Sequence, residues 1–118
     1  MEEQLVEDVL AFIEADQESN LKAYLNELNI SDVENLIDEL PQYAVRFIET
    51  LSINRAVNVF RILDFPTQER IIKKLAGNKL TEIIRRLPPD DRTSLFSELK
   101  GDAVKKLLIL LPDEDRIE

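Results

Sequence analysis

Large apolar residues recur along the chain in groups of three, and a leucine closes each group. The closing leucines follow one another at steps of 12 residues, with a single step of 11: Leu28, Leu40, Leu51, Leu63, Leu75, Leu87, Leu99 and Leu111. The positions four and three residues before each leucine are also apolar: Tyr24/Leu25, Leu36/Ile37, Phe47/Ile48, Val59/Phe60, Ile71/Ile72, Ile83/Ile84, Leu95/Phe96 and Leu107/Leu108. Such spacing places side chains on one face of an α-helix, whereas a strand would alternate. The pattern therefore predicts a series of helices, each two to three turns long.

The predicted connections contain the residues that usually end or begin helices. All five prolines and both glycines fall there: Pro41, Pro66, Pro88, Pro89, Pro112, Gly77 and Gly101. Candidate helix starts are Ser31, which has a capping-box spacing to Glu34, and Asn78, Asp90 and Asp102. The segment at about residues 3–15 has a separate apolar stripe outside the period, formed by Leu5, Val9, Leu10, Phe12 and Ile13. We expect this segment to cap the array.

Isolated helices of this length are marginal in water, so their stability must come from packing against neighbours. Two successive helices make a repeat of 24 residues, which is also the distance between LPPDDR at 87–92 and LPDEDR at 111–116. We therefore expect an all-α fold of the armadillo/HEAT-like type. In this fold, short helices stack as helical hairpins into a right-handed superhelix, a solenoid. The aromatic positions Tyr24, Phe47, Phe60 and Phe96 would lie in the core, and the pattern leaves Phe65 unassigned.

The chain has the length of a single domain, which we expect to span residues 1–118. Its parts would be N-terminal capping helices in 1–28, repeats in 29–112 and the start of a truncated further helix in 113–118. A natural solenoid closes with a polar-faced helix. Because such a helix is missing after the second corner motif, we expect the chain to be a fragment of a longer protein.

Composition excludes several kinds of site. The sequence contains no Cys and no His, so a disulfide, a thiolate metal site and the usual general base are all absent. We find no phosphate-binding glycine loop and no nucleophile–base pair, and we therefore expect no enzymatic activity. No apolar run approaches the roughly 18 residues of a membrane span, and the acidic N-terminus differs from a secretory signal. We expect a soluble, cytoplasmic chain.

The net charge of −9 is unevenly distributed. Residues 1–60 carry 13 acidic and three basic residues, whereas residues 61–118 carry 11 acidic and 12 basic ones. An acidic half argues against nucleic-acid binding and is compatible with solubility, a cationic partner or hard cations. The acidic clusters Asp38/Glu39 and Asp113/Glu114/Asp115 are expected to be solvated. Basic pairs occur at Lys73/Lys74, Arg85/Arg86 and Lys105/Lys106. The first two pairs are 12 residues apart and predict a solvated face or a docking stripe for an acidic partner or anionic lipid.

The LPPDDR motif with its following LF pair, the 12-residue period and the acidic opening MEEQLVEDVLAFIEADQESN together resemble the cytosolic N-terminal domain of MgtE-type magnesium transporters. The resemblance covers nearly the whole chain. It implies a superhelix that precedes paired CBS domains, a connecting helix and a membrane pore, in a full-length protein that is a homodimer. It also implies that Mg²⁺ binds between this domain and the CBS domains and favours the closed pore. The chain would then lie on the cytoplasmic side of the cell membrane.

The same resemblance assigns candidate metal ligands. It places Asp90 where the family has a magnesium-contacting aspartate, and Asp91 is the neighbouring candidate. Two further acids of the family correspond to Asn58 and Ser94. Mg²⁺ commonly binds through one or two carboxylates plus waters, so we expect weak binding that requires the CBS domain. The alternative for Asp90 is a helix cap after the two prolines.

A second hypothesis for the function is a helical-repeat scaffold for protein interactions. This could be an adaptor of the flagellar rotor type (FliG-like) or a free-standing adaptor. The Glu-His-Pro-Gln signature of the rotor family is absent from this sequence.

Overall fold

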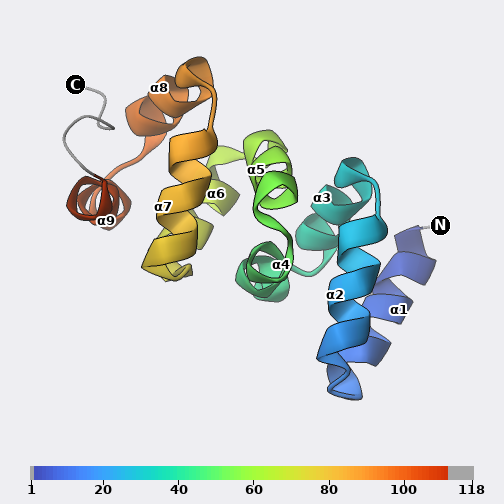
Figure 1. Ribbon diagram of the computed structural model, residues 1–118. Helices are drawn as coiled ribbons and strands as arrows, with labels where there is room; N and C mark the ends of the chain where they lie inside the picture. The colour runs from blue at the N-terminus through green and yellow to red at the C-terminus, as the bar shows by residue number, and fades with distance from the viewer. Residues whose placement is uncertain (1, 112–118) are drawn as a thin grey trace. The chain divides into compact units, whose positions relative to one another are not determined.

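The structure, a computed structural model, describes residues 2–111 of the 118-residue chain (Figure 1). Its elements are α1 (Glu2–Glu14), α2 (Glu18–Glu27), α3 (Ile30–Glu39), the 3₁₀ turn η1 (Pro41–Tyr43), α4 (Ala44–Thr50), α5 (Ile53–Ile62), α6 (Phe65–Lys74), α7 (Gly77–Arg86), α8 (Pro89–Glu98) and α9 (Asp102–Leu110). No strand occurs within these bounds. The expected all-α class is confirmed, and the right-handed superhelix of stacked hairpins stays a prediction. The expected helix in 113–118 lies outside the described residues.

The closing leucines explain the 12-residue period. Leu75 ends α6: its backbone N–H donates to the carbonyl of Ile71 at 2.8 Å, and its own backbone is extended, with φ −72° and ψ 146°. Leu99 ends α8 in the same way, with φ −73° and ψ 149°. Both side chains are buried. A leucine therefore ends each of these two helices and anchors the corner in the core, and a ten-residue helix with a two-residue connection gives the period.

The chain groups into two compact units, Met1–Val59 and Phe60–Glu118. In the first unit α1 and α2 run antiparallel side by side, and α1 also packs on α3 (Figure 1). In the second unit α9 packs on α6 and α7. The apolar core of the first unit comprises Val9, Leu21, Leu25, Val33, Leu36, Ile37, Leu40, Ala44, Phe47, Ile48, Leu51, Ala56, Val57 and Val59. That of the second comprises Phe60, Leu63, Ile71, Ile72, Leu75, Leu80, Ile83, Ile84, Leu87, Leu95, Leu99, Ala103, Leu107 and Leu111.

Most predicted inward positions are buried, and the exceptions have structural reasons. Tyr24 and Phe96 are half-buried rather than in the core as expected, and the partly buried hydroxyl of Tyr24 donates to Asp8. Leu108 is 37% exposed because it lies on the outer side of α9, next to Ile109, which is 80% exposed. Phe65, which the pattern left unassigned, is 41% exposed.

The expected helix starts are wrong in detail because the helices begin one or two residues earlier. Ser31 lies inside α3, whose N-cap is Asn29, so no capping box forms, and Asn78 likewise lies inside α7. Pro66 is within the first turn of α6 rather than in a connection. The cap of α6 is Asp64, whose side chain accepts a hydrogen bond from the backbone N–H of Thr67 at 2.8 Å.

Basic side chains donate hydrogen bonds to carbonyl groups at the ends of α-helices three α-helices earlier in the chain. In the first unit, Arg55 of α5 donates from Nη2 to the carbonyls of Leu25 and Leu28, at the end of α2. In the second unit, Lys106 of α9 donates from Nζ to the carbonyls of Lys73 and Leu75, at 3.1 and 2.8 Å. The last carbonyls of a helix have no partner within it, and they favour a nearby cation. Lys106 is therefore a structural residue and not part of a solvated basic stripe.

Candidate functional site

The two candidate metal ligands lie in the first turn of α8. Pro89 is the first residue of this helix, Asp90 the second and Asp91 the third. The N-cap is Pro88, and no side chain caps the helix, so the capping role considered for Asp90 is wrong. Carboxylates in the first turn still interact favourably with the partial positive charge of the helix N-terminus. Among the described residues, no third acidic side chain joins these two aspartates in a group that could hold a metal ion.

The structure separates the roles of these two aspartates. Arg61, in the last turn of α5, donates from Nε to Oδ2 of Asp91 at 2.7 Å, and the two side chains are 43% and 40% exposed. Asp91 is therefore engaged in an ion pair that joins α5 to α8. Asp90 is exposed and forms no ion pair with any residue in 2–111. Of the two, Asp90 has its carboxylate available to a cation.

The remaining candidates do not complete a metal site within the described part of the chain. Asn58 on α5 and Ser94 on α8 are both exposed. Among residues 2–111, no group of three or more acidic, His or Cys side chains could hold a metal ion. The cluster Asp113/Glu114/Asp115 lies outside the described residues. Any Mg²⁺ bound at Asp90 would need further ligands from water or from another domain.

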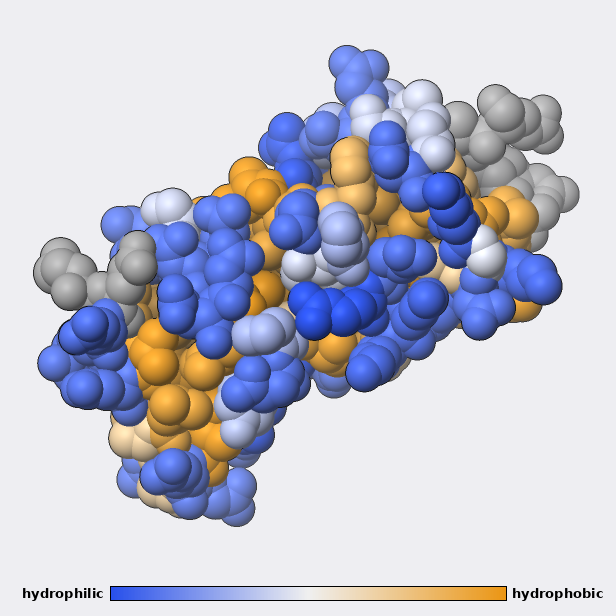
Figure 2. All heavy atoms as spheres, turned by 180° about the vertical axis from the view of Figure 1, so that it is seen from behind, coloured by the Kyte–Doolittle hydropathy of each residue, from blue (hydrophilic) through white to orange (hydrophobic). Residues whose placement is uncertain are grey.

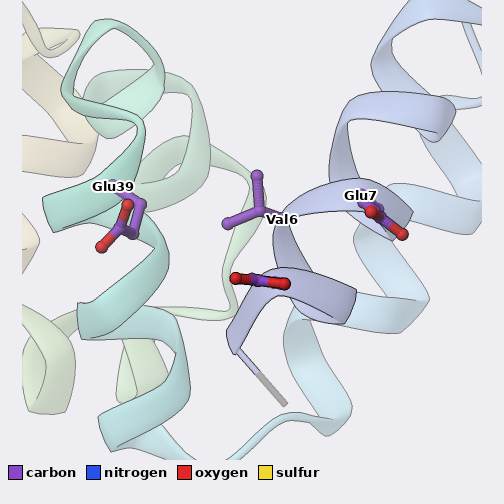
Figure 3. Close-up of a pocket in the computed structure, with 4 residues that line it drawn as sticks. Val6, Glu7 and Glu39 are labelled. Carbon is purple, nitrogen blue, oxygen red and sulfur yellow. The ribbon is translucent and has the colours of Figure 1, made fainter.

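A pocket of about 400 Å³ lies between α1 and α3, and the sequence pattern does not predict it. Glu3, Val6 and Glu7 of α1 and Glu39 of α3 line it. Figure 3 shows Val6 projecting from α1 into the space between the helices, with Glu39 on the facing helix. We call this feature the α1–α3 groove. The predicted stripe on the first helix omits Val6, and the apolar spacing of Val6 to Val9, Leu10 and Ile13 is the signal that could have revealed it.

Tyr24 and Asp64, which are not part of α8, have pKa values displaced from the ordinary ones. Burial raises the pKa of Tyr24 to about 12, and the hydrogen bond to Asp8, 2.9 Å from the hydroxyl, acts in the same direction. The cap hydrogen bond from Thr67 lowers the pKa of Asp64. Both shifts arise from contacts between or within helices, so we assign these residues to stability.

Comparison with known families gives one match. The family model described as the MgtE intracellular N domain matches residues 28–118, which leaves α1 and α2 outside the matched range. No curated protein matches the chain. None of the helices in 2–111 is long and apolar enough to cross a membrane.

Proposed function

This chain belongs to the MgtE intracellular N-domain family, and on that premise we propose that it is the Mg²⁺-sensing regulatory domain of a magnesium transporter. It acts on the cytoplasmic side of the cell membrane, without enzymatic activity of its own. It docks on the CBS domains of the same full-length chain through Mg²⁺ ions bridged by acidic side chains, and docking favours the closed pore. The full-length protein is a homodimer.

The family match over residues 28–118 is the observation that carries this proposal. The matched range includes both candidate ligands, Asp90 and Asp91. It supports a transporter domain over the FliG-like rotor adaptor and over a free-standing adaptor.

The residues present suit a shared Mg²⁺ site better than a complete one. Mg²⁺ prefers oxygen ligands, retains several waters and is commonly bound through one or two carboxylates. Asp90 offers one exposed carboxylate, and the described residues hold no cluster that would bind the ion alone. The site proposed here therefore has Asp90 on one side and acidic residues of the CBS domain on the other.

A shared site provides the regulation. Two acidic surfaces repel one another until a cation lies between them, so Mg²⁺ binds the docked state better than the separated state and shifts the population toward it. When Mg²⁺ is low, the domain separates from the CBS domains. The size of the shift is limited by the difference in affinity between the two states.

Titration with Mg²⁺ of the chain alone and of the chain joined to its CBS domains tests this function. We expect the chain alone to bind at about millimolar Mg²⁺ or more weakly, and the joined protein to compact at lower concentration, as measured by small-angle scattering. Asp90→Asn should raise the midpoint of compaction by roughly tenfold, equivalent to about 1.4 kcal/mol. Asp102→Asn removes the same charge from an exposed first-turn position on α9 and should leave the midpoint within about twofold.

If Mg²⁺ neither binds nor compacts the joined protein, the sensor function is wrong. If compaction occurs and Asp102→Asn acts as strongly as Asp90→Asn, the sensor function stands and Asp90 is not the ligand.

A further inference from the structure

The α1–α3 groove combines an apolar floor with an acidic rim. Val6 forms the floor, and Glu3, Glu7 and Glu39 surround it. A smaller hollow adjoins it and shares Val6 and Glu39, with Leu5, Asn35 and Leu36 as its other lining residues. Figure 2 shows apolar surface gathered near the N-terminal end of the chain, over α1, and bordered by hydrophilic side chains.

Helix α1 exposes this surface because it is apolar around much of its circumference. Val9 is fully buried against the neighbouring helices, whereas Leu5, Val6, Leu10, Phe12 and Ile13 are half-buried. A helix that packs on one side only would carry a single apolar stripe. Contacts with both α2 and α3 account for much of this wide apolar face, and the part of it at Val6 stays open to the groove.

The charge of the groove is not neutralised within its unit. Glu3, Glu7 and Glu39 form no ion pair with any described residue, and none of the described residues that line the groove is basic. The unit Met1–Val59 contains three basic residues. Arg46 pairs with Glu18, Arg55 binds carbonyls at the end of α2, and Lys22 lines a different pocket. The rim therefore presents uncompensated negative charge beside an apolar floor.

We propose that the α1–α3 groove docks a basic amphipathic helix of a partner protein. An apolar side chain of the partner packs on Val6, and its Lys or Arg side chains pair with Glu3, Glu7 and Glu39. Glu3 and Glu7 are four residues apart, which is about one helical turn, so they match basic residues spaced one turn apart on a helix. Two helices with a groove between them form the usual receptor for an amphipathic helix, which is recognised by its apolar anchors.

This interaction is separate from the proposed Mg²⁺ sensing. All four lining residues lie in the first unit, and Glu39 alone of them is inside the family-matched range, whereas Asp90 is in the second unit. Compaction with the CBS domains and peptide binding are therefore measured independently, and failure of either leaves the other standing.

The test uses the full 118-residue chain and a blocked 14-residue peptide with two leucines one turn apart and four flanking lysines. Binding is followed by calorimetry and by amide chemical shifts. We expect shifts confined to α1 and α3, and affinity that falls as salt is raised. A peptide with glutamate in place of lysine, and one with serine in place of leucine, should each bind at least tenfold more weakly.

Two double variants that remove the same number of charges test whether the peptide binds at the groove. Glu7→Gln/Glu39→Gln should weaken peptide binding at least tenfold, and Glu14→Gln/Glu27→Gln, at exposed positions outside the groove, should weaken it less than twofold. Val6→Ser should weaken binding while thermal unfolding verifies that the fold is kept. Equal effects of the two double variants, or equal binding of the serine peptide, would show non-specific attraction and overturn the proposal. It is also overturned if α1 and α3 shift with protein concentration alone or with Mg²⁺ alone, since a second copy or a cation would then be the occupant.

Discussion

Arg61 at the end of α5 binds Asp91 at the start of α8, with 2.7 Å between Nε and Oδ2. This ion pair distinguishes two adjacent aspartates that are chemically equivalent in the sequence. Each partner also lies at the helix end that suits its charge, because a cation is favoured at a C-terminus and an anion at an N-terminus. Asp91 therefore serves the packing of α5 and α8, and Asp90 keeps its carboxylate exposed.

Removing Arg61 should release Asp91 for cation binding. We expect Arg61→Ala to lower the free energy of unfolding by about 0.2–1 kcal/mol, as for other exposed ion pairs. In the chain joined to its CBS domains, the same variant should strengthen Mg²⁺ binding because Asp91 no longer has a competing cation. Lys74→Ala removes the same charge from an exposed position on α6 and controls for the change in net charge. Urea unfolding and Mg²⁺ titration of both variants measure these effects, and equal strengthening by the two would contradict the release of Asp91.

The sequence predicted the helices well and the contacts between helices poorly. The leucine period marks each corner because Leu75 and Leu99, like most closing leucines, end a helix and are buried at the same point. The partner of Asp91 could not be predicted, because Arg61 is 30 residues away and no local pattern joins them. The role of Lys106 was missed for the same reason.

The candidate site was predicted only in part. The LPPDDR motif located Asp90 and Asp91 correctly at the start of a helix, but the two prolines led to an expected cap that the structure lacks. The α1–α3 groove was missed because its acids come from separate segments, Glu3 and Glu7 from α1 and Glu39 from α3. The spacing of apolar residues could have indicated Val6, but the approach of Glu39 to α1 depends on tertiary packing and has no local signature.

Asp64 should make stability depend on pH in the acidic range. Its side chain accepts the N–H of Thr67, which holds its pKa below the ordinary value. A carboxyl with a lowered pKa stabilises the fold above its unfolded pKa of about 3.9, and this stabilisation is lost as pH falls through the folded value. We expect Asp64→Ala to cost about 1 kcal/mol at neutral pH and much less at pH near 2. Urea unfolding at both pH values measures the difference, and a cost that did not change with pH would exclude the cap as its source.

Tyr24 should limit stability in the alkaline range. Its neutral hydroxyl donates to Asp8, and burial together with this bond raises its pKa to about 12. The folded state therefore favours the neutral phenol: the stabilisation is present below the ordinary pKa of about 10 and is lost as pH rises through about 12. In Tyr43→Phe, where Tyr24 is the remaining tyrosine of two, absorbance should report a titration well above 10. Adding Asp8→Asn should move that titration down, and an unchanged midpoint would show that Asp8 makes no contribution.

Lys106 should contribute far more to stability than its neighbour Lys105. Lys106 donates to two carbonyls at the end of α6, whereas Lys105 is exposed. We expect Lys106→Met to lower the free energy of unfolding by about 1–2 kcal/mol, because two charge-assisted hydrogen bonds to carbonyls at the end of α6 are lost. Lys105→Met makes the same chemical change on the next residue and should cost less than about 0.5 kcal/mol. If chemical unfolding shows that both variants lose a comparable free energy of unfolding, the carbonyl contacts do not stabilise the chain.

Gly101 ends a connection of three residues, and the 12-residue period is kept because the helix that follows is one residue shorter. The residues Leu99, Lys100 and Gly101 precede the nine-residue helix α9, whereas the connections before α7 and α8 have two residues and their helices ten. Gly101 has φ 58° and ψ −127°, a conformation that side chains with a Cβ rarely adopt, and a Cβ there would meet no atom within 4 Å. Gly101→Ala should therefore cost about 1–3 kcal/mol through backbone strain alone, while Lys100→Ala should change stability by less than about 0.5 kcal/mol. Because no atom would contact the added Cβ, Gly101→Asn should lower the free energy of unfolding by a similar amount, as measured by chemical unfolding. An alanine variant as stable as the parent chain would refute a requirement for glycine at this corner.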